Sequence, residues 1–92
     1  MGIVILVAKV EDYDKWEPTL LEDAPMIKAA GAKTASILRD LNDPNTIIVT
    51  SVWENLEAAK KLIESDEIRA RMEEGGVIGR PEIYYMEEKV VF

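Results

Sequence analysis

The side chains of this sequence that could take part in chemistry are its two tryptophans, its three tyrosines and its charged residues. The sequence contains no cysteine and no histidine. This excludes a thiolate nucleophile, a Ser-His or Cys-His catalytic pair and a cysteine-based metal site. It also removes the commonest general base and the usual proximal haem ligand. The candidates considered first are therefore the indoles, the phenols and one guanidinium group.

Trp53, Arg39, Tyr84 and Tyr85 are candidates by residue type. The Trp53 indole can line a pocket or donate a hydrogen bond to a ligand oxygen, and Arg39 can bind a carboxylate or an enolate. The structural alternatives are a plug where a strand becomes a helix for Trp53, and an ion pair with a nearby acid for Arg39. Tyr84 and Tyr85 are adjacent, so on a strand they point to opposite faces. One should face the helices and any pocket, the other a partner subunit, and either phenol could donate a hydrogen bond or serve only in packing.

Composition and charge limit the partners. The net charge of −7 has the wrong sign for a nucleic-acid surface or an anionic membrane. The apolar run Ile3–Ala8 is too short to span a bilayer and lacks the flanks of a signal peptide, so we expect a cytoplasmic protein. Segment 40–45 lacks the glycine and the closing glutamate of a calcium loop, and segment 75–79 lacks the lysine of a phosphate loop. We expect no metal and no cofactor.

Hydrophobic patterning predicts a β-α-β-β-α-β order of elements. Prolines 18 and 25 predict a bend or a break in the first helix, near residues 23–25. The predicted segments are a strand at Ile3–Ala8, a helix from an Asp12 cap to a Gly31 cap, a strand at Lys33–Arg39, a turn at 41–45, a strand at Thr46–Trp53, a helix after an Asn55 cap, a helical piece from Ser65 or Asp66 to Met72, a loop at 75–81 and a strand at Glu82–Phe92.

This order predicts one ferredoxin-like α+β domain over residues 1–92, with both helical regions on the same face of a four-stranded antiparallel sheet. The first and third strands are nevertheless apolar on both faces. A monomer would therefore expose a large apolar sheet face, which soluble monomers rarely do. We expect a homodimer in which two sheets pack face to face.

The sequence resembles the dimeric α/β-barrel superfamily, and within it small proteins related to antibiotic biosynthesis monooxygenases and cyclase-like proteins. The resemblance covers nearly the whole chain in the expected order. It rests on segments 12–16 and 30–31 at the two ends of the first helix, Arg39-Asp40 before the Asn-Asp-Pro-Asn turn, Trp53-Glu54 before 56–59, Ser65 before Ile68, and segment 79–82.

The resemblance implies several activities among the relatives: cofactor-free monooxygenases of aromatic polyketides, haem-degrading enzymes and small isomerases. Monooxygenases of this type carry an asparagine on the first strand and a tryptophan and a tyrosine around the pocket. Trp53 matches the tryptophan at the end of a strand, whereas the first strand, Gly2 to Val10, has no asparagine. The position that is often histidine in relatives falls near Leu62. A haem-degrading member is therefore not expected.

The resemblance and the helical stripe together place a pocket between the first helix and the sheet. Its expected lining on the helix is Tyr13, Trp16, Leu20 and Met26 or Ile27, which suits a flat aromatic or quinone-like ligand. The alternative is that this stripe is simply the core face of the helix. Two functions stay open at this point. One is a cofactor-free monooxygenase-like or cyclase-like enzyme whose substrate supplies the electrons, and the other is a non-catalytic dimeric module that binds a ligand or has a structural role.

Overall fold

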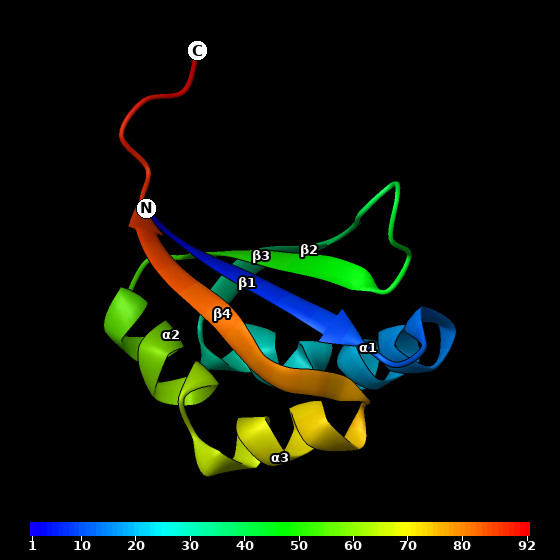
Figure 1. Cartoon of the computed structure of the whole chain (residues 1–92). Coiled ribbons are helices and arrows are strands. Elements are labelled where there is room, and N and C mark those ends of the chain that lie inside the picture. Colours follow the sequence, from blue (N-terminus) through cyan, green and yellow to red (C-terminus); the bar gives the residue numbers. More distant parts are fainter.

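A computed structural model describes all residues, 1–92. The chain forms one antiparallel sheet in the order β2-β3-β1-β4, with three helices on one of its faces (Figure 1). This confirms the predicted ferredoxin-like α+β fold. The elements are β1 (Gly2–Val10), α1 (Tyr13–Ala30), β2 (Ala32–Arg39), β3 (Thr46–Trp53), α2 (Leu56–Ile63), α3 (Asp66–Glu74) and β4 (Val77–Glu87).

Each helix begins at a polar side chain that caps its free backbone N–H groups. Asp12 accepts a hydrogen bond from the backbone N–H of Asp14 at 3.0 Å, and Asn55 accepts one from Glu57 at 2.9 Å. Ser65 caps α3 by accepting from Ile68 at 3.2 Å. The Asp12 and Asn55 caps were predicted from the sequence, and for α3 the structure selects Ser65 from the two predicted starts, Ser65 and Asp66.

Helix α1 is continuous across both of its prolines. The predicted break near residues 23–25 does not occur. Pro18 and Pro25 are both exposed, so the carbonyl groups that lose a helical partner can be hydrated from the solvent side. The unbroken α1 therefore presents one long face to the sheet.

Strand β4 begins at Val77, five residues earlier than the predicted start at Glu82, and it ends at Glu87. Its pairing with β1 shifts register, because Lys9 pairs with Ile78 and Val7 pairs with Glu82. The extra residues bulge out of the ladder at Gly79, whose φ is +69°. Pro81 is tolerated because β4 is an edge strand. Gly79 and Pro81 therefore belong to a bulge within β4, and the loop predicted at 75–81 is wrong for residues 77–81.

The core between the helices and the sheet is divided into two clusters that share no buried residue. One surrounds Trp53 and consists of Val4, Ala32, Trp53 and Ala59. The other surrounds Trp16 and consists of Ala8, Val10, Trp16 and Ile47. Between them, Leu6, Val49 and Ile37 lie side by side across three strands and are only half-buried. The middle of the sheet is thus less completely covered than its two ends.

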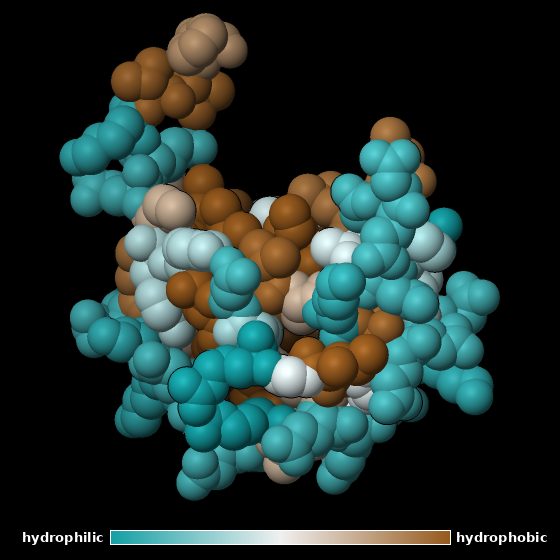
Figure 2. Space-filling model, in the orientation of Figure 1, coloured by the Kyte–Doolittle hydropathy of each residue, from teal (hydrophilic) through white to brown (hydrophobic).

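No helix covers the opposite face of the sheet. Strand β1 contributes Ile3, Ile5 and Val7 to this face, and β3 contributes Ile48, Thr50 and Val52, which pair with them. At the edges, the side chains of Leu38, Tyr84 and Met86 are 52%, 43% and 45% exposed. Figure 2 shows hydrophobic side chains gathered between the β2–β3 hairpin and the C-terminal segment, which leaves the sheet on this side. We call this surface the helix-free face.

Candidate functional site

A cavity of about 550 Å³ lies between α1 and the sheet, where the two core clusters are separated. Its floor consists of two rows of side chains that cross the sheet. One row is Val4, Ser51 and Ala35, and the other is Leu6, Val49 and Ile37. Eighteen of the 26 lining residues are hydrophobic, so the cavity is an apolar site with few polar contacts.

The roof of the cavity is one face of α1. Trp16, Leu20, Ala24 and Ile27 recur every three or four residues, and all of them line the space. Trp16 is only 5% exposed, because its indole also packs in the core cluster at that end. The face predicted for α1 from its helical spacing is therefore the face that lines the cavity.

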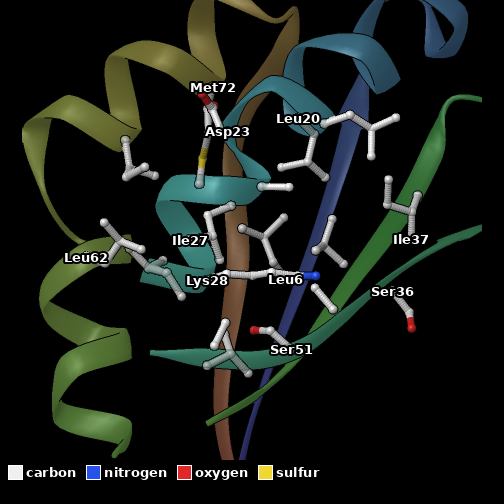
Figure 3. Close-up of a pocket in the computed structure, with 18 of the residues that line it drawn as sticks. Leu6, Leu20, Asp23, Ile27, Lys28, Ser36, Ile37, Ser51, Leu62 and Met72 are labelled. Atoms are coloured by element: carbon white, nitrogen blue, oxygen red, sulfur yellow. The ribbon is translucent and has the colours of Figure 1, made fainter. Parts of the chain in front are cut away.

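Helices α2 and α3 close one side of the cavity with Leu62, Ile68 and Met72. The close-up in Figure 3 shows Met72 of α3 beside Asp23 of α1. There the Nε atom of Arg71 lies 2.6 Å from a carboxylate oxygen of Asp23. The Asp23 side chain is only 14% exposed, so this ion pair is partly shielded from water and links α1 to α3.

The lining is positively charged although the chain is acidic. It contains one acidic side chain, Asp23, and three basic ones, Lys28, Lys33 and Arg71. Asp23 is paired with Arg71, and Lys33 lies 2.7 Å from Glu54 outside the cavity, where this contact lowers the pKa of Glu54. Lys28 forms no ion pair within 4 Å. Because Arg71 also lies 4.0 Å from Glu22, Lys28 is the basic side chain of the lining that is free to pair with a negatively charged ligand oxygen.

Ser51 is the most buried polar side chain of the cavity floor, at 8% exposed. The Trp53 indole Nε1–H donates a hydrogen bond of 2.8 Å to its oxygen. These two residues are neighbours on the same face of β3, because side chains two apart on a strand share a face. Figure 3 shows Ser51 on the sheet among the side chains that line the cavity.

Of the residues proposed from the sequence, Trp16, Leu20 and Trp53 line the cavity, as does Ile27, the alternative to Met26. The other candidates lie outside the lining, namely Tyr13, Met26, Arg39, Tyr84 and Tyr85. The predicted place of the cavity, between the first helix and the sheet, therefore agrees with the structure, whereas its lining differs in part.

Tyr13 and Arg39 contact each other near the start of α1. The Arg39 guanidinium lies 4.7 Å from the centre of the Tyr13 ring, in a cation–π contact, and the Tyr13 ring lies 5.7 Å from that of Trp16. Burial, and then the charge of Glu17, raise the pKa of the Tyr13 phenol. Arg39 stacks on an aromatic face and forms no ion pair, an arrangement that the sequence did not indicate.

Tyr84 and Tyr85 lie on opposite faces of β4, as the strand period requires. Tyr85 packs on the helix side against the Trp53 cluster, and Tyr84 lies on the helix-free face. A hydrogen bond of 2.6 Å to Glu82 raises the pKa of Tyr84, and burial raises that of Tyr85. The tyrosine on the helix side is therefore Tyr85, although it does not line the cavity.

Ser51, Asp23, Lys28 and Arg71 line the cavity without having been proposed from the sequence. Only Ser51 carried a usable signal, since it shares the strand face of Trp53. Asp23 and Arg71 lie 48 positions apart and meet only through the packing of α1 against α3.

No group of three or more acidic side chains has the geometry to hold a metal ion. None of the three helices has the length and hydrophobicity of a membrane-spanning segment.

The fold and the cavity define a class: small ferredoxin-like α+β domains with an apolar pocket between the first helix and the sheet. The sequence profile of the family described as "Antibiotic biosynthesis monooxygenase" matches residues 5–74. The chain therefore belongs to the antibiotic biosynthesis monooxygenase family. No curated protein sequence matches it.

Solved structures with the same fold share little sequence with the chain. The crystal structure of SnoaB, a cofactor-independent oxygenase from Streptomyces nogalater, has a TM-score of 0.78 at 12% identity, covering 98% of this chain and 94% of that one. A candidate antibiotic biosynthesis monooxygenase from Bordetella bronchiseptica has a TM-score of 0.76 at 16% identity, with coverage of 99% and 100%. Another, from Caulobacter crescentus, has a TM-score of 0.75 at 20% identity, with coverage of 97% and 90%. At sequence identities of 12–20%, these similarities show a shared fold and not a shared activity.

Proposed function

We propose that this protein is a cofactor-free monooxygenase-like or cyclase-like enzyme of the cytoplasm. It acts on an aromatic or polyketide-like small molecule bound between α1 and the sheet. In the oxygenase form of the proposal the substrate supplies the electrons to O₂, so that no metal, flavin or haem is needed. Family membership supports this reaction class, and SnoaB is a cofactor-independent oxygenase of the same fold.

The observation that carries the proposal is the cavity itself. Its volume of about 550 Å³ lies within the roughly 300–1,000 Å³ of small-molecule sites. Trp16 and Trp53 line it with large apolar surfaces, and the Trp53 N–H is already donated to Ser51. If α1 packed flush on the sheet, Leu6, Val49 and Ile37 would be buried in a continuous core, yet they are half-buried. The space between helix and sheet therefore suits a flat hydrophobic molecule.

The charge of the lining supports a substrate that ionises. Removing a proton from a phenol or from a carbon beside a carbonyl group leaves an oxyanion, and this anion is the electron-rich form that can react with O₂. An excess of basic side chains around an apolar space lowers the free energy of such an anion. Lys28 supplies this charge without an acidic partner of its own.

The alternative is a non-catalytic dimeric module whose cavity only binds a ligand or whose aromatic residues only pack. It is favoured by the absence of histidine and of an asparagine on β1. Substitution Trp16→Phe separates the two functions. Loss of turnover with an unchanged melting temperature supports the enzyme, whereas a parallel loss of stability supports a packing role.

A binding screen followed by oxygen uptake tests the proposal. Hydroxylated polycyclic aromatics and quinones should raise the melting temperature, and native mass spectrometry should detect any ligand that co-purifies. The bound compounds should then be tested as substrates with an oxygen electrode. Ala24→Phe, which fills the cavity from the α1 side, should abolish both the rise in melting temperature and the oxygen uptake. Failure of every such compound to bind would contradict the proposal.

We also propose that two copies associate through the helix-free face. Ile3, Ile5 and Val7 at its centre are apolar and only half-buried, and no helix lies over them. Contiguous apolar patches of this kind are rare on soluble monomers and are removed from water most simply by self-association. A light-scattering mass of one chain at micromolar concentration would contradict this arrangement.

A further inference from the structure

The hydroxyl of Ser51 has a donor that nothing in the chain uses. A serine hydroxyl donates one hydrogen bond and accepts up to two. Its oxygen already accepts from the Trp53 indole at 2.8 Å, but no group of the chain accepts from the Ser51 O–H. At 8% exposure, the side chain also has little access to bulk water. A buried donor without an acceptor costs free energy, and a ligand acceptor would recover it.

The other uncharged polar side chains of the lining differ from Ser51. Thr19 is half-buried and already donates to the Trp16 carbonyl at 2.6 Å, whereas Thr34 and Ser36 of β2 are exposed and can bind water. Ser51 alone combines burial, a place on the cavity floor and an unused proton. It lies between the apolar side chains Val4 and Ala35 in its row.

The contact with Trp53 also orients and strengthens this donor. Because the indole N–H points at the Ser51 oxygen, the hydroxyl proton must point elsewhere, and the open direction is the cavity. A hydroxyl that accepts one hydrogen bond becomes a better donor through polarisation. Trp53 is 1% exposed and fixed in a core cluster, so the pair is rigid before a ligand arrives.

We infer that the Ser51 hydroxyl, oriented by Trp53, binds the oxygen of the ligand and selects for a ring system that carries a carbonyl or an oxyanion at that point. This inference rests on the proposed function, because it requires a ligand in the cavity. It gives Ser51 the role of a substrate-binding residue and Trp53 that of a positioning residue. A buried group built to hydrogen-bond its ligand discriminates against the analogue without the partner atom.

A matched ligand pair tests the inference. 9-Fluorenone and fluorene are flat tricyclic molecules that differ in one carbonyl group. Their dissociation constants, measured by titrating tryptophan fluorescence, should give a preference for 9-fluorenone in the wild type. Ser51→Ala should lower this preference about three- to tenfold, the worth of one hydrogen bond, and Ser51→Thr should retain it. The infrared carbonyl stretch of bound 9-fluorenone should lie at lower frequency in the wild type than in Ser51→Ala.

Thr19→Val is the matched control, because it removes a hydroxyl whose proton is already used. It should change both dissociation constants by the same factor and keep the ratio. An unchanged ratio and carbonyl stretch in Ser51→Ala would overturn the role of Ser51, while ligand binding in the cavity would still stand. If 9-fluorenone bound the wild type no more tightly than fluorene, the inference would fail, whereas the proposed function fails only if the hydroxylated aromatics and quinones do not bind either.

Discussion

Tyr84 and Tyr85 are neighbours in the chain, yet their phenols lie in opposite surroundings. The Tyr84 hydroxyl donates to Glu82 at 2.6 Å on the helix-free face. The Tyr85 hydroxyl is buried on the helix side and has no hydrogen-bond partner. This side chain therefore contributes packing through its ring and carries a desolvation cost at its oxygen.

Tyr85→Phe should stabilise the protein by about 1 kcal/mol at neutral pH, because it removes an unpaired buried hydroxyl and keeps the ring. Burial raises the pKa of Tyr85, so above about pH 10 the folded state holds this proton more tightly than the unfolded state does. Stability therefore falls as pH rises from about 10 toward the folded-state pKa. The variant should lose less stability over this range in urea titrations.

Tyr84→Phe is the control for that experiment. It removes an exposed hydroxyl, so its neutral-pH stability should differ little from that of the wild type. The pKa values of Tyr13 and Tyr84 are also raised. The Tyr85→Phe variant should therefore still lose part of its folding stability at alkaline pH. Destabilisation by Tyr85→Phe at neutral pH would show that its hydroxyl is paired after all.

The ion pair between Asp23 and Arg71 should couple α1 to α3. A double-mutant cycle with Asp23→Asn and Arg71→Gln, read by chemical unfolding, should give a favourable coupling energy because Asp23 is largely shielded from water. The pair of Lys89 and Glu87 is exposed, with side chains 78% and 70% accessible, and should give almost none. Equal coupling in both cycles would contradict the linking role.

Gly2 lies where β1 packs closely against the side chain of Leu56 in α2. A Cβ atom at this position would overlap with Cγ of Leu56, so one of the two residues must move. Gly2→Ala should cost roughly 1–3 kcal/mol of unfolding free energy, which is typical of overpacking. Combined with Leu56→Ala, which opens the space, it should cost less than the sum of the single changes. Additive costs would rule out the steric explanation.

Ile5→Lys tests the proposed dimer. Ile5 lies on the helix-free face, paired with Thr50 and Tyr84, so a charge there would be buried between two sheets. Light scattering should give two chains for the wild type and one for the variant, with an unchanged circular dichroism spectrum. Ala70→Lys, on the exposed side of α3, should leave the mass unchanged. A variant that still has the mass of two chains would place the interface elsewhere.

Local chemistry made much of the fold predictable. Asp12 and Asn55 were identified as caps because each precedes an amphipathic segment, and apolar β-branched runs identified β1 and β3 as strands that are apolar on both faces. The start of β4 was missed because Gly79 and Pro81 usually end a strand, whereas an edge position and a bulge accommodate both. Of the predicted bend or break in α1, the break does not occur, because a proline is less disruptive where water can reach the freed carbonyl group.

The candidate site was predictable only where residue spacing within a single helix or strand determines which side chains face the cavity. Helical spacing placed Trp16 and Leu20 on the cavity face of α1. Arg39 could not be assigned to the Tyr13 ring, because that contact depends on how the end of β2 lies beside the start of α1. Ser51 was passed over because a strand serine next to apolar residues is chemically ordinary until its hydrogen bonds are known.

The central claim is that a ligand occupies the cavity between α1 and the sheet, and nuclear magnetic resonance of the two indole N–H groups tests it most directly. Trp16 and Trp53 are the only tryptophans, and both line the cavity. Titration with a hydroxylated tricyclic aromatic should move both indole signals and the backbone signals of Leu20, Ile27 and Ser51. Unmoved indole signals at saturating ligand, or shifts confined to the helix-free face, would contradict the account.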